Sequence, residues 1–449
     1  MANIVSRIWE MKDLRNRVLF TLAMLGVYRL GIFVPVPGVD TDQLGKFFAE
    51  QSGTLFGLYD MFSGGALSQF SVFVLGIMPY ITASIIMQLM ARMVPALERI
   101  QKEGQQGQNR ITQYTRYLTI IIAVVQSYLM AVSLEQMRVQ SGAVVLHPGF
   151  SFQLMTVLTV TAGSCFIMWL GEQMTERGVG NGASIIITAG IIASFPSDVM
   201  QVFTLVGLGE LNLLQAVLLF VFLFAVVMAI VFVERGQRRV PLQYAKRVLG
   251  RRVYEGQTTY LPLKVNTAGV IPPIFASSLL MLPSTVGAFA DIPILDWLSG
   301  QFYPGSWLYN VVFAGLVIFF AFFYTAITFS PVDVAENLKK QAAFIPRVRP
   351  GSETIDYLDW LLARLTTGGA VYLAVVCVMP SILANSIQNL NIFFNFGGTG
   401  VLILVGVSLD TVAQIEAKLA ERRYDANVGP GGKSARGRRR RLGSQAGLF

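Results

Sequence analysis

Long runs of apolar residues, separated by short charged segments, set the pattern of this 449-residue chain. An α-helix rises about 1.5 Å per residue, so roughly 20 apolar residues cross the hydrocarbon core of a bilayer. The alternation of apolar and polar positions that is typical of a membrane β-barrel is absent. The runs predict an all-α polytopic membrane protein with about ten transmembrane helices, at residues 18–34, 55–91, 117–134, 154–171, 183–195, 211–233, 265–286, 308–329, 366–382 and 401–417.

Two of these runs depart from a regular membrane helix. The second has no charged side chain after Asp60, but Ser63-Gly64-Gly65 and Pro79 interrupt it. Its early piece, 55–62, would rise only about 12 Å as a helix, and lipid offers no partners for its freed backbone groups. We therefore predict a cavity at membrane depth with this short helix folded into it. The fifth run, 183–195, either continues into its polar flanks or lies tilted inside the bundle.

A short string of small and apolar residues occurs twice in the chain. The pattern G-x-x-P-x-I-x-A-S stands at residues 76–84 and again at residues 269–277. Paired segments interrupted by Gly and Pro, one in each half of a membrane protein, are the best pointer in a sequence to its working site. The repeat therefore predicts that both segments line the same site.

Composition and charge support the membrane assignment and predict its orientation. Only 14% of the residues are charged, against about 25% in soluble domains, and the mean hydropathy is +0.56. Of the 35 Lys and Arg residues, all but Arg29, Lys46 and Arg138 fall on one side of the predicted spans. The positive-inside rule then places both termini in the cytoplasm. Arg29 lies near the outer end of the first span, where we expect it to anchor the helix at the lipid interface.

Outside the predicted spans, the chain has a charged N-terminal segment, two long basic loops and a basic tail. Residues 1–17 form a charged amphipathic segment without a cleavage site, so we expect the first span to be retained. Two long basic loops, 234–264 and 330–365, favour a docking surface for an anionic membrane, RNA or an acidic protein. Residues 418–449 read as a basic cytoplasmic tail, whose Gly/Arg-rich part after Asp425 is expected to be a disordered arm. Cys165 and Cys377 lie in apolar runs and are expected in the core.

The chain resembles members of the SecY/Sec61-alpha family, which are the channel subunits of the protein-export translocon. The matching strings run in order along nearly the whole chain. They are PVPGVD at 35–40, MFSGGALSQFSVFVLGIMPYI at 61–81, QYTRY at 113–117, MWLGEQMTERGVGNGASIII at 168–187, VERGQRR at 233–239, LPLKVNTAGVIPPIFASS at 261–278, AENLKK at 335–340 and FIPRVRPG at 344–351.

The resemblance implies two inverted five-helix halves, 18–210 and 211–417, around a central pore. It implies a constriction of aliphatic side chains, in which this chain has alanine where the family usually has a bulkier residue. By motif position the pore ring is Ile77, Ile81, Ala183, Ile187, Ile274 and Ile403. A re-entrant helix at residues 55–67 would plug this pore from outside. Its residues are Leu55, Phe56, Leu58, Tyr59, Met61, Phe62, Gly64, Gly65 and Leu67.

The family also implies a lateral gate between its second and third helices on one side and its seventh and eighth on the other. Gln88 and Gln126 are costly in lipid, so we expect a hydrogen-bonded cluster across this seam. The candidate seam residues are Thr82, Gln88, Gln126, Ser277, Ser278 and Leu282.

The implied function is a protein-conducting channel of the cytoplasmic membrane that passes unfolded polypeptides and releases hydrophobic segments into lipid. The implied partners are SecE, SecG, the motor ATPase SecA, the ribosome with its RNA and proteins, SecDF, YidC, membrane lipids and polypeptides bearing signal sequences. SecA or the ribosome would dock on Arg238, Arg239, Arg251, Arg252, Arg347 and Arg349.

Two other classes of protein remain as alternatives. A secondary transporter also has inverted repeats and broken helices, but coupling needs ionisable groups at mid-membrane, and only Arg29, Glu172 and Asp410 come near. An intramembrane hydrolase needs a His-supported serine, a metal motif or paired aspartates, and the single histidine, His147, lies in a polar loop. We expect no catalytic residue, metal site or cofactor, so energy comes from a partner or from the membrane potential.

Overall fold

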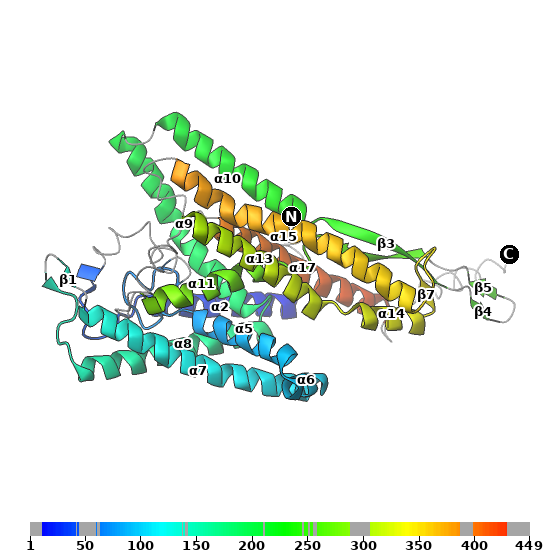
Figure 1. Cartoon of the computed structure of the whole chain (residues 1–449), viewed down its shortest axis with the longest axis horizontal. Coiled ribbons are helices and arrows are strands. Elements are labelled where there is room, and N and C mark those ends of the chain that lie inside the picture. Colours follow the sequence, from blue (N-terminus) through cyan, green and yellow to red (C-terminus); the bar gives the residue numbers. More distant parts are fainter. Residues whose placement is uncertain are drawn as a thin grey trace, which may run out of the picture.

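The computed structural model describes residues 11–41, 43–44, 60, 63–136, 138–139, 142–209, 212–244, 247–249, 252–254, 258–287, 306–386 and 398–428. Within these ranges there are ten long helices, one for each predicted run. They are α2 (Lys12–Ile32), α5 (Met78–Met93), α7 (Gln105–Gln136), α8 (Phe150–Arg177), α9 (Gly182–Leu208), α10 (Leu213–Glu234), α11 (Ile271–Gly287), α13 (Trp307–Thr328), α15 (Ser352–Ser386) and α17 (Gly398–Val428). Most of them run along the long axis of the molecule, whereas α9 crosses it obliquely (Figure 1).

Seven of the described helices are long and apolar enough to cross a membrane by length and composition alone. An eighth candidate is α5 together with the short α6 (Pro95–Lys102), although the two are bent by 99° at the break between them. α2 carries several charges, and the apolar described part of α11 is short, Ile271–Leu280. The chain is therefore a helical multi-pass membrane protein with irregular elements among its spans.

The fifth helix is much longer than its apolar run. α9 has 27 residues and continues through Pro196 to Leu208, where Gly209 ends it in the left-handed conformation. Its polar residues remain helical because Ser194 and Ser197 donate to the carbonyls of Ile191 and Ser194, one turn earlier. Of the two explanations left open by the sequence, the structure has the first, continuation into the polar flank.

The break in the second run is real. Residues 63–77 form a series of turns, and the helix begins only at Met78, so Pro79 lies in the first turn, where its missing N–H has no intrahelical partner to lose. Backbone bonds tie these turns to the end of α2: Val36 donates to Phe70 at 2.9 Å and Val72 to Val34 at 2.9 Å. The predicted short helix at 55–62 lies outside the described residues, apart from Asp60.

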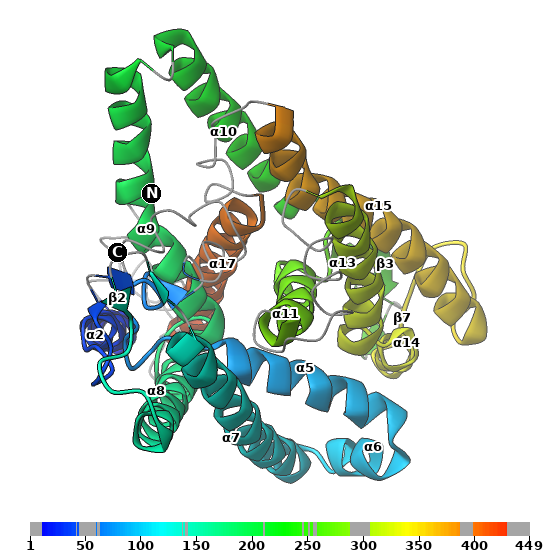
Figure 2. The same cartoon turned by 60° about the vertical axis from the view of Figure 1, so that its left-hand side comes forward.

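The helices pack in two groups that meet near the middle of the molecule. α2, α5, α7, α8 and α9 contact one another along the first half of the chain, and α10, α11, α13, α15 and α17 do so along the second half. The groups meet where α5 contacts α11 and where α9 contacts α17 (Figure 2). α17 and α11 therefore stand between the outer helices of both groups.

The two basic loops form one projection at one end of the molecule (Figure 1). β3 (Gln237–Tyr244) pairs antiparallel with β6 (Thr258–Lys264) and with β7 (Ala343–Phe344), so residues a hundred positions apart share one sheet. This sheet has its own apolar cluster with α14 (Pro331–Lys340) and α15, including Val240, Leu263, Leu338, Ile345 and Leu358. Smaller hairpins pair β4 (Arg247–Leu249) with β5 (Arg252–Tyr254) and β1 (Arg138–Val139) with β2 (Gly142–Ala143).

Candidate functional site

The two copies of the repeated string have the same local structure. Gly76 and Gly269 both adopt left-handed backbone angles, with φ of +56° and +63°, which only glycine adopts at little cost. In each copy the helix begins two residues later, α5 at Met78 and α11 at Ile271. The repeat therefore presents two equivalent helix starts, one in each half of the chain.

Five of the six residues predicted to form a pore ring come together in one apolar cluster. Their side chains are between 0% and 6% exposed, and they come from α5 and the residue before it, from α9, from α11 and from α17. These are Ile77, Ile81, Ile187, Ile274 and Ile403. The sixth, Ala183, is partly buried at the edge of the same cluster. Helices from both halves thus contribute branched aliphatic side chains to one buried cluster.

Glycines let the backbones approach closely around this cluster. A Cβ atom on Gly182 would overlap the carbonyl oxygen of Gly171, so α8 and α9 are in backbone contact there. A Cβ on Gly171 would lie 3.3 Å from Cδ1 of Ile77. On the other side, a Cβ on Gly406 of α17 would overlap a methyl group of Val270. The close packing of the cluster depends on these small residues, which the sequence analysis did not single out.

A hollow of about 460 Å³, lined by both polar and apolar side chains, lies beside the cluster. Its lining includes Val270 and Val407, which are members of the cluster, and the amide side chain of Asn181. Lys264 and Asp410 also line it and pair with each other, with 3.2 Å between Nζ and Oδ1. The hollow therefore lies between the buried aliphatic cluster and a half-exposed ion pair.

The predicted plug segment ends in a turn that hydrogen bonds hold in place. Oδ1 of Asp60 accepts the backbone N–H groups of Leu67 and Ser68 at 2.9 and 3.0 Å. Gly64 and Gly65 both have left-handed angles, with φ of +73° and +88°, which allow the chain to reverse. Of the predicted plug residues, Gly64, Gly65 and Leu67 belong to this turn, so the prediction that the plug helix continues to Leu67 is wrong. The other six, Leu55, Phe56, Leu58, Tyr59, Met61 and Phe62, lie outside the described residues.

Two side chains of α2 bind the same turn. The hydroxyl of Tyr28 donates to the carbonyl of Ser63 at 3.0 Å, and Nη1 of Arg29 donates to the carbonyl of Gly64 at 2.7 Å. The guanidinium of Arg29 therefore has a partner in the protein backbone, and its expected role as an anchor at the lipid interface stays a prediction. The sequence could not identify this partner, which lies 35 residues away.

The geometry can be compared with that of known proteins. A family model described as SecY matches residues 71–412. The protein translocase subunit SecY of Aquifex aeolicus (strain VF5) is 44% identical over 430 residues, which cover 95% of this chain and 100% of the relative. That of Escherichia coli (strain K12) is 46% identical over 418 residues, covering 92% and 94%. The chain belongs to the SecY family.

Solved structures share the fold at lower sequence identity. "The structure of a protein conducting channel" aligns with a TM-score of 0.62 at 15% identity, covering 94% of this chain and 95% of that one. A second, on the plug domain of the SecY protein, aligns with a TM-score of 0.63 at 18% identity and the same coverage. At these identities the likeness concerns the fold, and it extends over nearly all of this SecY-family chain.

The SecY family gate would correspond here to the line between α5 with α7 and α11 with α13. Gln88 donates to Ser84 on its own helix at 3.1 Å, and Ser277 and Ser278 both donate to the carbonyl of Ile274 at 3.0 and 2.7 Å. Oε1 of Gln126 is buried without a partner among the described residues. The expected hydrogen-bonded cluster between Gln88 and Gln126 is thus absent from the described structure, because these groups are satisfied locally or not at all. Thr82 is buried in α5, and the side chain of Leu282 lies outside the description.

The predicted docking arginines belong to the basic projection. Arg238 and Arg239 are exposed on β3, and Arg347 stands at a turn with φ of +70°. The side chain of Arg349 is 88% exposed and lies 3.8 Å from Glu353. Arg251 lies outside the described residues, as does the side chain of Arg252.

The three charged residues considered as coupling groups for a transporter all have partners. Arg29 binds the carbonyl of Gly64, Asp410 pairs with Lys264, and Glu172 accepts two hydrogen bonds from Arg116, at 2.8 and 2.7 Å. The Arg116–Glu172 pair clamps α7 to α8, a structural role that the sequence analysis missed. Among the described residues, no group of three His, Cys, Asp or Glu side chains could hold a metal ion.

Proposed function

We propose that this chain is the pore of a bacterial translocon. It passes unfolded secretory polypeptides across the cytoplasmic membrane and releases their apolar segments sideways into lipid. The observation that carries the proposal is the buried aliphatic cluster, to which both halves of the chain contribute and beside which a hollow lies; its members include Ile77, Ile81, Ile187, Ile274 and Ile403. Membership of a family of protein translocase subunits supports the same function.

The chemistry of this aliphatic cluster suits a passage for polypeptides of any sequence. A moving polypeptide presents every kind of side chain, so a constriction that bound one kind well would stall it. Isoleucine side chains offer no hydrogen bonds, and an apolar constriction can stop ions by dewetting. Ala183 leaves the ring one large side chain short, so the segment at 55–67 would complete the seal as a plug on the outer side.

Lateral release requires that the two groups of helices separate along the line between α5 and α11. α5 and α11 contact each other, and each begins just after a left-handed glycine, which can absorb a change of backbone direction. A hydrophobic signal sequence would stabilise the open seam by occupying it, since its apolar surface prefers lipid and gate helices to water.

The basic projection would receive the partners that deliver polypeptides. Its exposed arginines suit RNA or acidic protein surfaces, so SecA or the ribosome would bind at Arg238, Arg239, Arg347 and Arg349, together with Arg251 and Arg252. A structural neighbour, Sec61 in a canine ribosome-channel complex, is consistent with ribosome binding. SecE and SecG would complete the channel, with SecDF and YidC as further partners.

This assignment implies that the chain is not an enzyme and binds no cofactor, so a partner ATPase or the membrane potential supplies the energy. Both termini would lie in the cytoplasm, because nearly all Lys and Arg residues fall on that side. Secondary transport is disfavoured, since each candidate coupling charge has a structural partner.

A stalled export substrate tests the proposal. A photo-reactive amino acid at Ile77, Ile274 or Ile403 should cross-link to a polypeptide arrested in transit, because all three positions would surround it. Ile192 of α9 is the matched control, since it is 52% exposed on the outer surface of the bundle. Cross-links from Ile192 but not from the three ring positions would refute the proposed path.

A further inference from the structure

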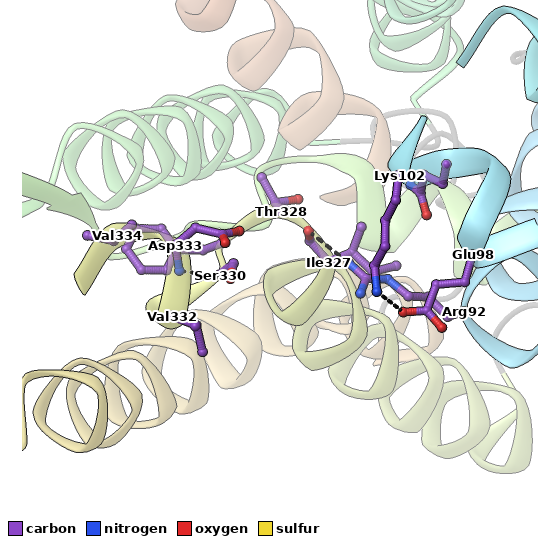
Figure 3. A pocket seen from close by; sticks show the side chains of 11 residues that line it. Arg92, Glu98, Lys102, Ile327, Thr328, Ser330, Val332, Asp333 and Val334 are labelled. Carbon is purple, nitrogen blue, oxygen red and sulfur yellow. Dashed lines mark hydrogen bonds and ion pairs between the residues drawn. The ribbon is translucent and has the colours of Figure 1, made fainter. Parts of the chain in front are cut away.

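Arg92 spans one end of the seam between the two helix pairs (Figure 3). It lies in the last turn of α5, and its Nη2 donates to the carbonyl of Ile327, in the last turn of α13, at 3.3 Å. The last carbonyls of a helix have no partner within that helix and carry the negative end of its dipole, so a guanidinium suits them. Gln88, Ser277 and Ser278 bond within their own helices, whereas Arg92 reaches across the seam.

A hollow of about 600 Å³ lies beside this contact, lined by residues of α5, α6, α13 and α14. Arg92, Glu98 and Lys102 line it from one side of the seam, and Thr328 and Asp333 line it from the other (Figure 3). Arg92 is exposed, and the hollow leaves its long side chain room to change partner.

A second acceptor for Arg92 lies on its own side of the seam. Pro95 begins α6, which turns by 99° from α5 and brings Glu98 back towards Arg92. Lys102 donates to Glu98 at 2.7 Å. This bond and the charge of Lys102, with a smaller contribution from the charge of Arg92, lower the pKa of the Glu98 carboxyl. Glu98 is therefore ionised at neutral pH and can accept a hydrogen bond from Arg92.

We propose that Arg92 is the clasp of the seam and sets how hydrophobic a signal sequence must be to open it. In the closed seam Arg92 binds the end of α13. When α5 and α13 separate, Arg92 loses Ile327 and turns to Glu98, which moves with α5. This inference rests on the lateral gate proposed above, and it assigns to one side chain a defined partner in each state.

Two substitutions should shift export in opposite directions. Arg92→Gln removes the bonds of both states. Lys102 already holds Glu98, so the bond of the closed state is the larger loss, and export of a client with a weak signal should rise about twofold. Glu98→Gln weakens the acceptor of the open state, so export of the same client should fall by a similar factor. Arg92→Lys keeps the charge and should lie between wild type and Arg92→Gln.

Glu103→Gln is the matched control, because Glu103 pairs with Arg110 at 3.6 Å and does not line the hollow. Export of a client with a strong signal should be the same in all four variants. Spin labels at the exposed positions Met93 and Val332 should give a longer distance distribution in Arg92→Gln than in the parent protein carrying the same labels.

The outcomes separate the clasp from the channel. If Glu98→Gln and Arg92→Gln shift export in the same direction, or if weak and strong signals respond equally, Arg92 is only a structural residue and the inference is overturned. If no variant changes the export of the weak-signal client while the strong-signal client is exported, the proposed role of Arg92 is refuted but the proposed channel function is not. If wild-type protein reconstituted with its partners exports no client at all, the proposed function itself fails.

Discussion

Two hydrogen bonds join α2 to the turn at the end of the predicted plug segment, and their loss should make the closed channel leak ions. Arg29→Leu deletes a charge-assisted bond of 2.7 Å to the carbonyl of Gly64. Such bonds contribute about 1.5–3 kcal/mol, and the lower end applies here because Arg29 is only partly buried. Since 1.4 kcal/mol corresponds to a factor of ten in an equilibrium constant, the closed turn should lose about tenfold in relative population.

Tyr28→Phe should have a smaller effect of the same kind. It removes a buried neutral bond of 3.0 Å to the carbonyl of Ser63 but keeps the ring that stacks on Phe73, with ring centroids 6.1 Å apart. A neutral bond contributes about 1 kcal/mol, so the expected shift is about fivefold. The assay is ion conductance of the reconstituted channel in a planar bilayer without client, and leak should rise in the order wild type, Tyr28→Phe, Arg29→Leu.

Leu30→Ala is the control, because Leu30 is 71% exposed on the outer face of the same helix. Unchanged leak in folded Arg29→Leu protein would refute the link between this turn and the seal. Equal leak from Leu30→Ala would attribute the effect to general loosening of α2.

Two further predictions follow from the packing and the projection. Gly182→Ala should lower the free energy of unfolding in detergent by about 1–3 kcal/mol, because the added Cβ would overlap the carbonyl oxygen of Gly171. Gly315→Ala should raise it by roughly 0.5–1 kcal/mol, because no atom lies within 4 Å of the added Cβ. A loss of stability in both variants would refute the argument from close backbone approach. Arg349→Glu should abolish SecA-driven transport in membrane vesicles while the protein still inserts, and normal transport by that variant would exclude Arg349 from the docking site.

Local patterns in the chain were enough to predict the elements. Each apolar run became a helix, and the Gly64-Gly65 and Pro79 interruptions became turns and a late helix start. The repeat at 76–84 and 269–277 correctly indicated two equivalent segments, because a left-handed glycine before a Pro-containing first turn is a local requirement. The boundary of α9 was missed, since Ser194 and Ser197 satisfy their hydroxyls inside the helix and polarity alone does not end it.

Partners across the fold could not be predicted in this way. Whether Arg29 faces lipid or Gly64, whether Gln88 reaches across the seam or bonds to Ser84, and which carbonyl Arg92 binds are all decided by where distant segments come to lie. The sequence by itself determined which segments form apolar helices, because burial of apolar surface depends on residue type along each helix. Only the tertiary structure decided which polar atoms meet, because a hydrogen bond requires two groups within about 3 Å, and chain separation carries no information about that distance.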